Sequence, residues 1–191
     1  MPSVTLSEAH LSFGDRTILD AVSFTLNKGS KIALHGANGS GKTTLMGVMA
    51  GELAPDGGGV HREKGTRLSY LPQSGPAGGS GLSLSATLLE EMEKAFAPGR
   101  RLLEELGLVE ENLSRQKGES PEARRLMVRH QELAESLEAS GYHRRRERIE
   151  RVLAGLGFAR EEFTRPVGEF SQGWQMRIGL ARILCEQADF L

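Results

Sequence analysis

The stretch Gly36-Ala37-Asn38-Gly39-Ser40-Gly41-Lys42-Thr43 decides the fold of this 191-residue chain. Its glycines let backbone N–H groups turn toward a phosphate without a Cβ in the way, and Lys and Thr follow at the spacing of a phosphate-binding loop. The segment Lys31–His35, apolar at its centre, precedes the loop and predicts a short buried strand. Lys42–Ala50 has helical spacing and is followed by Gly51, a helix terminator. A strand, a glycine-rich loop and a helix in this order predict a phosphate-binding loop.

Each residue type in the loop has a predicted role toward a nucleotide. The Lys42 ammonium suits the β- and γ-phosphates, the Thr43 hydroxyl suits magnesium, and Thr44 is placed to hydrogen-bond the α-phosphate. The start of the following helix adds the positive end of its dipole. We therefore expect ATP and Mg²⁺ as cofactors, held by Gly36, Ala37, Asn38, Gly39, Ser40, Gly41, Lys42, Thr43 and Thr44.

The segments around the loop predict an αβ region. Ala21–Leu26 alternates apolar and polar residues, as a half-buried strand does, and Arg67–Leu71 resembles a further strand. Pro55–Gly59 is typical of a tight connection. Ser74–Gly81 is rich in Gly, Ser and Pro and predicts a mobile loop.

From about Ser85 to Gly157 the chain is strongly helical, with Ser140-Gly141-Tyr142 as a break between helices. Acidic and basic residues balance there, which predicts a helical insert with a solvated face. The basic cluster Arg144–Arg151 has two open interpretations: an RNA-phosphate patch, or a solvated face paired with Glu147 and Glu150. The predicted inward residues are Leu126, His130, Leu133, Leu137, Ile149, Val152, Leu153 and Leu156 and, in a last helix over Gly173–Cys185, Met176, Leu180, Ile183 and Leu184.

The composition narrows the classes of function. A formal net charge of −1 gives no global reason to expect a nucleic acid or a membrane as partner. The single cysteine, Cys185, excludes an internal disulfide and is expected to pack in the core, and the five histidines lack metal-ligand spacing. The N-terminus lacks a signal-peptide pattern, and no apolar run approaches the ~20 residues of a membrane span. We expect a cytoplasmic protein without membrane insertion.

A second motif, Phe170-Ser171-Gln172-Gly173-Trp174-Gln175-Met176-Arg177, follows the helical region. Ser171 suits a helix N-cap, and the helix start is a second anion site. Together with the phosphate loop, this motif resembles the signature segment of the ABC ATPase superfamily. The resemblance implies an α/β P-loop fold with an N-terminal antiparallel β subdomain and a helical subdomain that carries an arm-like insert.

The same resemblance implies further site residues. Ser171, Gln172 and Gly173 would act in trans, on ATP held by a second ABC domain, although Gln172 stands where the family usually has glycine. Gln73, at the end of Tyr70-Leu71-Pro72-Gln73, would contact magnesium or the attacking water. Phe13 would stack on adenine.

Trp174 and the long charged insert look like the ABC-F branch, and like its first ATPase domain in particular. ABC-F proteins are soluble tandem ATPases that act on ribosomes, so the resemblance implies a second ABC domain and the ribosome or its RNA as partners. Two alternatives stay open: the motor subunit of an ABC membrane transporter, docked on a permease, and a non-hydrolysing nucleotide-binding fragment.

The predicted layout has three parts. Residues 1–84 form the β subdomain and the phosphate-loop part of the core, 85–157 the helical subdomain with its insert, and 158–191 the signature segment and its helix. In the family, the strand that delivers the magnesium-associated Asp and the catalytic Glu would begin where Ala188–Leu191 ends this chain. We therefore expect an incomplete core sheet and no certain catalytic residue. ATP hydrolysis is expected of the full-length protein, and very slow turnover of these 191 residues.

Overall fold

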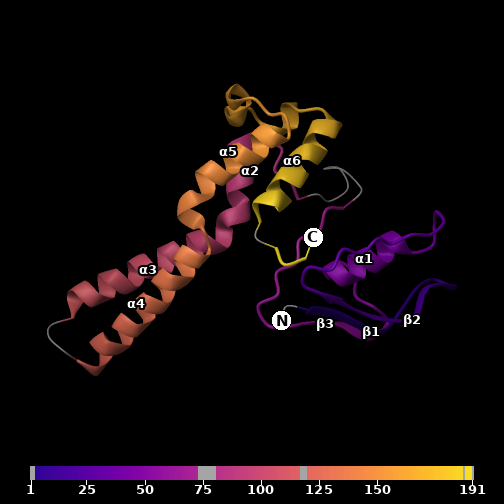
Figure 1. Cartoon of the computed structure of the whole chain (residues 1–191), viewed down its shortest axis with the longest axis horizontal. Helices are drawn as coiled ribbons and strands as arrows, with labels where there is room; N and C mark the ends of the chain where they lie inside the picture. Colours follow the sequence, from indigo (N-terminus) through magenta and orange to yellow (C-terminus); the bar gives the residue numbers. More distant parts are fainter. Residues whose placement is uncertain (1–2, 73–80, 117–119, 187, 191) are drawn as a thin grey trace. The chain divides into compact units, whose positions relative to one another are not determined.

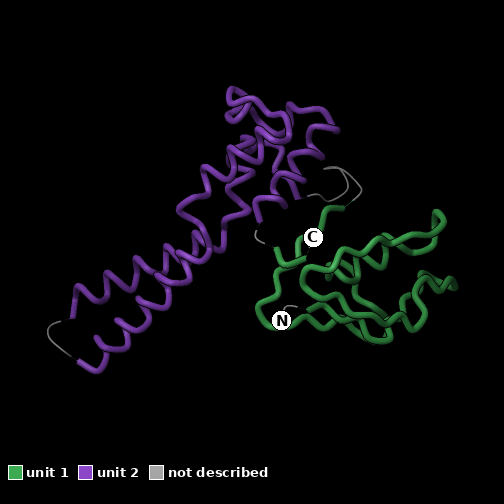
Figure 2. Tube along the Cα trace, in the orientation of Figure 1, with its two compact units in different colours: residues 1–73, 188–191 green, residues 74–187 purple. Residues whose placement is uncertain are grey.

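A computed structural model describes residues 3–72, 81–116, 120–186 and 188–190. The chain divides into two compact units, residues 1–73 with 188–191 and residues 74–187 (Figure 2). Within the described ranges, no helix combines the length and the apolar character that a membrane crossing requires.

The first unit is built on a three-stranded antiparallel sheet of order β2-β1-β3 (Figure 1). The strands β1 (Ser3–Phe13) and β2 (Arg16–Asn27) form a hairpin, and β3 (Gly57–Arg62) pairs with the other edge of β1. The helix α1 (Lys42–Ala50) packs on this sheet and ends as predicted, with Gly51 in the left-handed conformation. The core of the unit is formed by Leu6, Ala9, Leu11, Leu19, Leu45 and Val48.

Two predicted strands of this unit are not formed. Lys31–His35 is exposed and lies outside any strand, so the prediction of a buried strand there is wrong. A buried strand needs hydrogen-bonding neighbours, and no described strand pairs with this segment. Arg67–Leu71 is reduced to one parallel bridge between Leu68 and Phe190, beside which the Ser69 N–H donates to the Phe190 carbonyl at 3.0 Å. Among the described residues the strands form one sheet, of order β2-β1-β3.

The second unit is helical, as predicted. Gly141 takes a left-handed φ of 66° and separates two of its helices at the expected break. Its elements are α2 (Leu88–Glu93), η2 (Lys94–Phe96), α3 (Ala97–Arg115), α4 (Pro121–Ala139), η3 (Tyr142–Arg144), α5 (Arg145–Gly155), η4 (Arg160–Thr164), η5 (Val167–Glu169) and α6 (Gln172–Cys185). The long helices α3 and α4 lie side by side as a hairpin (Figure 1) at the place of the expected arm-like insert.

The core of the second unit lies between α2, α5 and α6 and includes Leu88, Met92, Ile149, Leu153, Ile178 and Ala181. The inward positions predicted for α4 and α5 are confirmed as buried or half-buried. In α6, Ile183 is buried as predicted, but Leu184 is 40% exposed, so its prediction as inward is wrong. The helix instead turns Gln175, Ile178, Ala181 and Cys185 inward, at the three-to-four-residue spacing of one helical face.

Candidate nucleotide-binding site

The phosphate loop leads directly into the N-terminus of α1. Gly41 takes a left-handed φ of 86°, and its carbonyl accepts the N–H of Leu45 at 2.8 Å, which closes the first helical turn. The first N–H groups of any helix lack partners within it, and they carry the positive end of the helix dipole. Since the first turn of α1 holds no acidic residue, nothing there competes with an external anion.

Two glycines of the loop lie so close to neighbouring side chains that an added Cβ would require those side chains to shift. A Cβ on Gly41 would lie 2.7 Å from Ile18 Cγ2, and a Cβ on Gly36 would lie 2.8 Å from the Ser40 hydroxyl oxygen. Residues 36–40 are nevertheless exposed on their outer side. The loop thus offers backbone at its surface, which is what close approach to a phosphate requires.

The Lys42 ammonium folds back over this loop. Its Nζ donates to the carbonyl oxygens of Gly36 at 2.9 Å and of Ala37 at 2.7 Å. Hydrogen bonds from a cation to a charged oxygen are roughly twice as strong as neutral ones. A phosphate that entered the loop would therefore compete well with these carbonyls for the lysine.

The other predicted contacts are distributed around the loop. Thr43 is exposed and Thr44 is half-buried in the first turn of α1, and Phe13 is 56% exposed at the end of β1. Arg16 was not predicted from the sequence, yet its Nη2 donates to the Gly39 carbonyl at 3.3 Å. Gln73 lies outside the described residues.

The predicted signature residues lie in the second unit, at the start of α6. Ser171 occupies the N-cap position, as expected, but its hydroxyl makes no capping hydrogen bond. Its carbonyl accepts the N–H of Gln175 at 2.9 Å. Ser171, Gln172 and Gly173 are all exposed, so the start of the helix faces solvent.

Buried side chains hold this segment in place. The Gln175 amide donates to the carbonyls of Phe170 at 2.8 Å and Val167 at 3.3 Å, which fixes the turn before Ser171. The Trp174 ring packs edge-on against Phe158, with ring centroids 4.9 Å apart. Trp174 therefore anchors α6 to the preceding loop.

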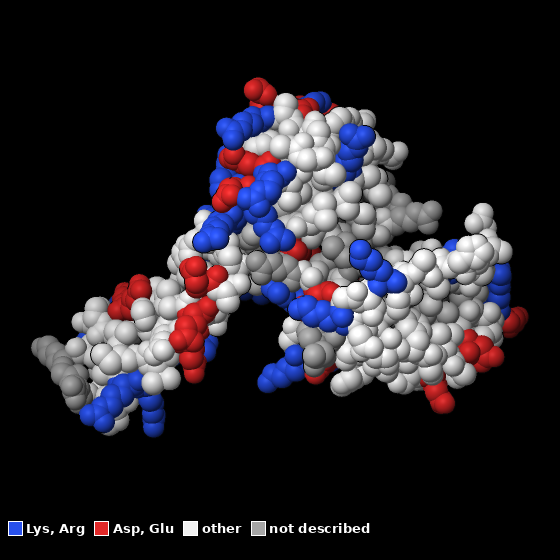
Figure 3. All heavy atoms as spheres, viewed as in Figure 1, with Lys and Arg blue, Asp and Glu red and all other residues white. Residues whose placement is uncertain are grey.

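The structure favours the paired interpretation of the basic cluster. Arg145 pairs with Glu93 at 3.0 Å, Arg146 with Glu150 at 2.9 Å and Arg151 with Glu147 at 2.5 Å. Arg148 donates to the Leu184 carbonyl at 3.0 Å. Figure 3 shows the corresponding mixture of basic and acidic side chains on the visible face of this unit.

Cys185 is buried, and this burial raises the pKa of its thiol to about 11. A thiol that stays protonated is a poor nucleophile and metal ligand. The prediction that Cys185 packs in the core is confirmed.

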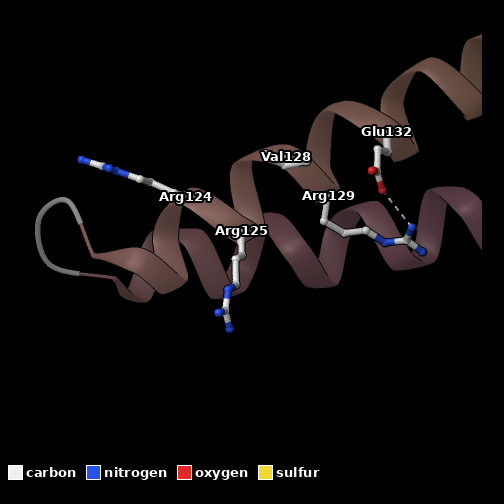
Figure 4. Close-up of a pocket in the computed structure, with 5 residues that line it drawn as sticks. All are labelled: Arg124, Arg125, Val128, Arg129 and Glu132. Carbon is white, nitrogen blue, oxygen red and sulfur yellow. Dashed lines mark hydrogen bonds and ion pairs between the residues drawn. The ribbon is translucent and has the colours of Figure 1, made fainter.

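A hollow of about 420 Å³ lies on the surface of α4, and none of the predicted site residues lines it. It is lined by Arg124, Arg125, Val128, Arg129 and Glu132 (Figure 4). Arg124 and Arg125 extend from α4 in this view, whereas Arg129 pairs with Glu132 and with Glu105 of α3. Of these two pairs, the one with Glu105 joins α4 to α3.

Comparison with known proteins identifies relatives over almost the whole chain. A family model described as ABC transporter matches residues 19–191. The chain is 31% identical over 189 residues to ABC transporter F family member 5 of Arabidopsis thaliana, covering 98% of this chain and 27% of that protein. It is also 31% identical over 188 residues to the ATP-binding protein YheS of Escherichia coli, with the same coverage. The chain thus spans about a quarter of the length of these relatives.

The fold has counterparts among solved structures. The chain superposes on MJ0796, a bacterial ABC transporter cassette solved as a dimer, with a TM-score of 0.58 and 16% identity. The match covers 97% of this chain and 70% of that one. It shows that both proteins share the fold of an ABC ATPase cassette.

Proposed function

The chain belongs to the ABC transporter family of ATP-binding domains, and we propose that it binds ATP with Mg²⁺ at residues 36–44. One observation carries the proposal. The Lys42 ammonium lies over a glycine loop at the N-terminus of α1, bonded to two backbone carbonyls that a phosphate can replace as acceptors.

The residues around the loop fit a magnesium–triphosphate. Lys42 would hold the β- and γ-phosphates, the N–H groups of the loop and of the first turn of α1 would hold the remaining phosphate oxygens, and the Thr43 hydroxyl would bind the metal. The described residues contain no cluster of three or more His, Cys, Asp or Glu that could hold a metal ion. A protein site with few ligands suits Mg²⁺, which usually keeps several waters and binds through substrate phosphates. Magnesium, when bound, would neutralise phosphate charge.

Calorimetric titration with Mg·ATP tests this site. The wild-type chain should bind, and Lys42→Ala should weaken the affinity at least roughly tenfold, because charge-assisted hydrogen bonds are lost. Lys64→Ala, which removes a positive charge from an exposed turn of the same unit, should bind like wild type. Equal affinities for wild type and Lys42→Ala would refute the assignment.

We further propose that Ser171, Gln172 and Gly173 contact ATP held by a second ABC domain. Their exposure at the start of α6 supports this role, as does the dimer formed by the related cassette MJ0796. A site completed in trans cannot be completed by one copy, so the 191 residues alone should hydrolyse ATP very slowly. Turnover as fast as that of the full-length protein, abolished by Lys42→Ala, would contradict this proposal.

The finer proposal is that the full-length protein is an ABC-F ATPase that acts on the ribosome. It is supported by the similarity to ABC transporter F family member 5, by Trp174 in the signature segment and by the α3–α4 hairpin at the position of an arm. The test is ATP-dependent co-sedimentation of the full-length protein with ribosomes. Co-purification with an integral membrane subunit, and no ribosome association, would favour a transporter motor instead.

A further inference from the structure

The β1–β2 hairpin touches the phosphate loop at two points. Arg16 Nη2 donates to the carbonyl oxygen of Gly39 at 3.3 Å. Two residues further along β2, Ile18 lies so close to Gly41 that a Cβ there would be 2.7 Å from its Cγ2. The start of β2 thus contacts the loop through Arg16 and through Ile18, which lies at an irregularity in the pairing of β1 with β2.

Phe13 lies opposite Arg16 in this hairpin. The two residues are paired across β1 and β2, and directly opposed residues share a face of a sheet. The side chain of Phe13 is 56% exposed, although burial would be the usual state of a phenylalanine. An exposed aromatic ring, opposite a residue that is bonded to the phosphate loop, is available to stack on a nucleobase.

We propose that Arg16 is a positioning residue that ties the hairpin carrying Phe13 to the phosphate loop, so that base and triphosphate are held together. The proposal rests on the proposed ATP site and adds the residue that joins its two halves. Arg16 acts through the Gly39 carbonyl, to which it already donates, whereas Lys42 supplies the charge that meets the phosphates.

The affinities for Mg·ATP and Mg·tripolyphosphate distinguish a role of Arg16 as a tether from a role that depends only on its charge. Mg·tripolyphosphate has phosphates but no base, so its binding requires only the phosphate loop. Binding of Mg·ATP also requires the β1–β2 hairpin to be held in a fixed position relative to the loop. Arg16→Ala should weaken Mg·ATP binding roughly tenfold, the size of one base-stacking contact. The same change should alter Mg·tripolyphosphate binding by less than about twofold, as expected of a surface substitution.

Two further variants test the mechanism in the same calorimetric assay. Arg16→Lys keeps a long side chain with an N–H donor and should retain most of the affinity for Mg·ATP. Phe13→Ala should remove the preference for Mg·ATP over Mg·tripolyphosphate. Adding Arg16→Ala to Phe13→Ala should then change the preference little, because both substitutions break the same coupling.

Lys64→Ala is the charge-matched control, and thermal melting reports whether each variant is folded. If Arg16→Ala unfolds at a lower temperature than wild type, Arg16→Met, which keeps the aliphatic part of the side chain, replaces it in the binding assay. Equal weakening of both ligands by Arg16→Ala, or additive losses in the double variant, would overturn the tether while leaving the ATP site intact. Absence of any Lys42-dependent binding in the wild-type chain would overturn both.

Discussion

Arg148, in the basic cluster Arg144–Arg151, makes its hydrogen bonds within the protein. Its guanidinium donates to the carbonyls of Leu184 at 3.0 Å and Glu186 at 3.4 Å, where α6 ends. The last carbonyls of a helix have no partner within it, and a cation there also complements the helix dipole. Arg148 belongs to the cluster that the sequence left open as an RNA-binding patch, but in the structure it caps the C-terminal end of α6.

We predict that Arg148→Ala lowers the free energy of unfolding of the second unit by about 1–2 kcal/mol, because two carbonyls lose a charged donor. The measurement is urea denaturation followed by tryptophan fluorescence. Arg144→Ala, an exposed change in the same cluster, should stay within about 0.5 kcal/mol of wild type. Equal stability of the two variants would contradict the capping role.

The motif of the phosphate loop can be recognised in the sequence, whereas the contact between Arg16 and the loop cannot. The loop motif is local, since Gly36, Gly41 and Lys42 lie close together in the sequence and the Lys42 ammonium donates to the Gly36 carbonyl. Arg16 reaches Gly39 only because the hairpin folds onto the loop, and its neighbours in the sequence resemble those of any surface arginine. Contacts of this kind depend on tertiary packing.

Among the elements, helices were predicted well because their signals are local. The positions of α1 and α4 follow from apolar spacing and from terminators such as Gly51 and Gly141. The strand β3 was missed because Gly57–Gly59 predicts a connection. In the structure, Gly58 lies so close to β1 that a Cβ would be 2.0 Å from the Glu8 carbonyl oxygen, so glycine is required by a pairing partner far away in the sequence.

Asp189 joins residues 188–190 to the segment that follows β3. Its carboxylate accepts the Arg67 N–H at 3.1 Å and pairs with the Lys28 ammonium at 3.0 Å. The Arg67 N–H, and after it Lys28, hold the pKa of Asp189 below its usual value. A carboxyl whose pKa is lowered by folding stabilises the folded state above its unfolded pKa, and this contribution is lost as the pH falls through the folded value.

We therefore predict that Asp189→Asn removes part of the acid sensitivity of the chain. The stability lost between pH 7 and pH 3, measured as the shift of the urea midpoint, should be smaller in Asp189→Asn than in wild type. Asp15→Asn, in the exposed hairpin turn, serves as control. An unchanged acid sensitivity in Asp189→Asn would show that the carboxylate contributes nothing to the folded state.

At the scale of the whole molecule, the two units have separate cores. The core of the first unit is the smaller set and is centred on Leu6 and Val48, whereas the second is centred on α2, α5 and α6. Two units with separate cores need not unfold together, and the unit with the smaller core is expected to unfold at a lower urea concentration. The single tryptophan, Trp174, reports only on the second unit.

We predict that urea unfolding is not two-state. The far-ultraviolet circular dichroism signal, which follows both units, should begin to fall at a lower urea concentration than the Trp174 fluorescence changes. Mg·ATP should raise the urea concentration at which the first transition occurs, because a ligand that binds only the folded state stabilises it. Coincident transitions by both probes would indicate a single cooperative unit.

Hydrogen exchange of the backbone amides tests directly whether Mg·ATP binds at residues 36–44. With Mg·ATP present, we predict slowed exchange over residues 36–45, where loop and helix N–H groups would turn from solvent to phosphate, and no such slowing in Lys42→Ala. Binding of Mg·ATP that left these amides unchanged, or slowed exchange only elsewhere in the chain, would contradict it.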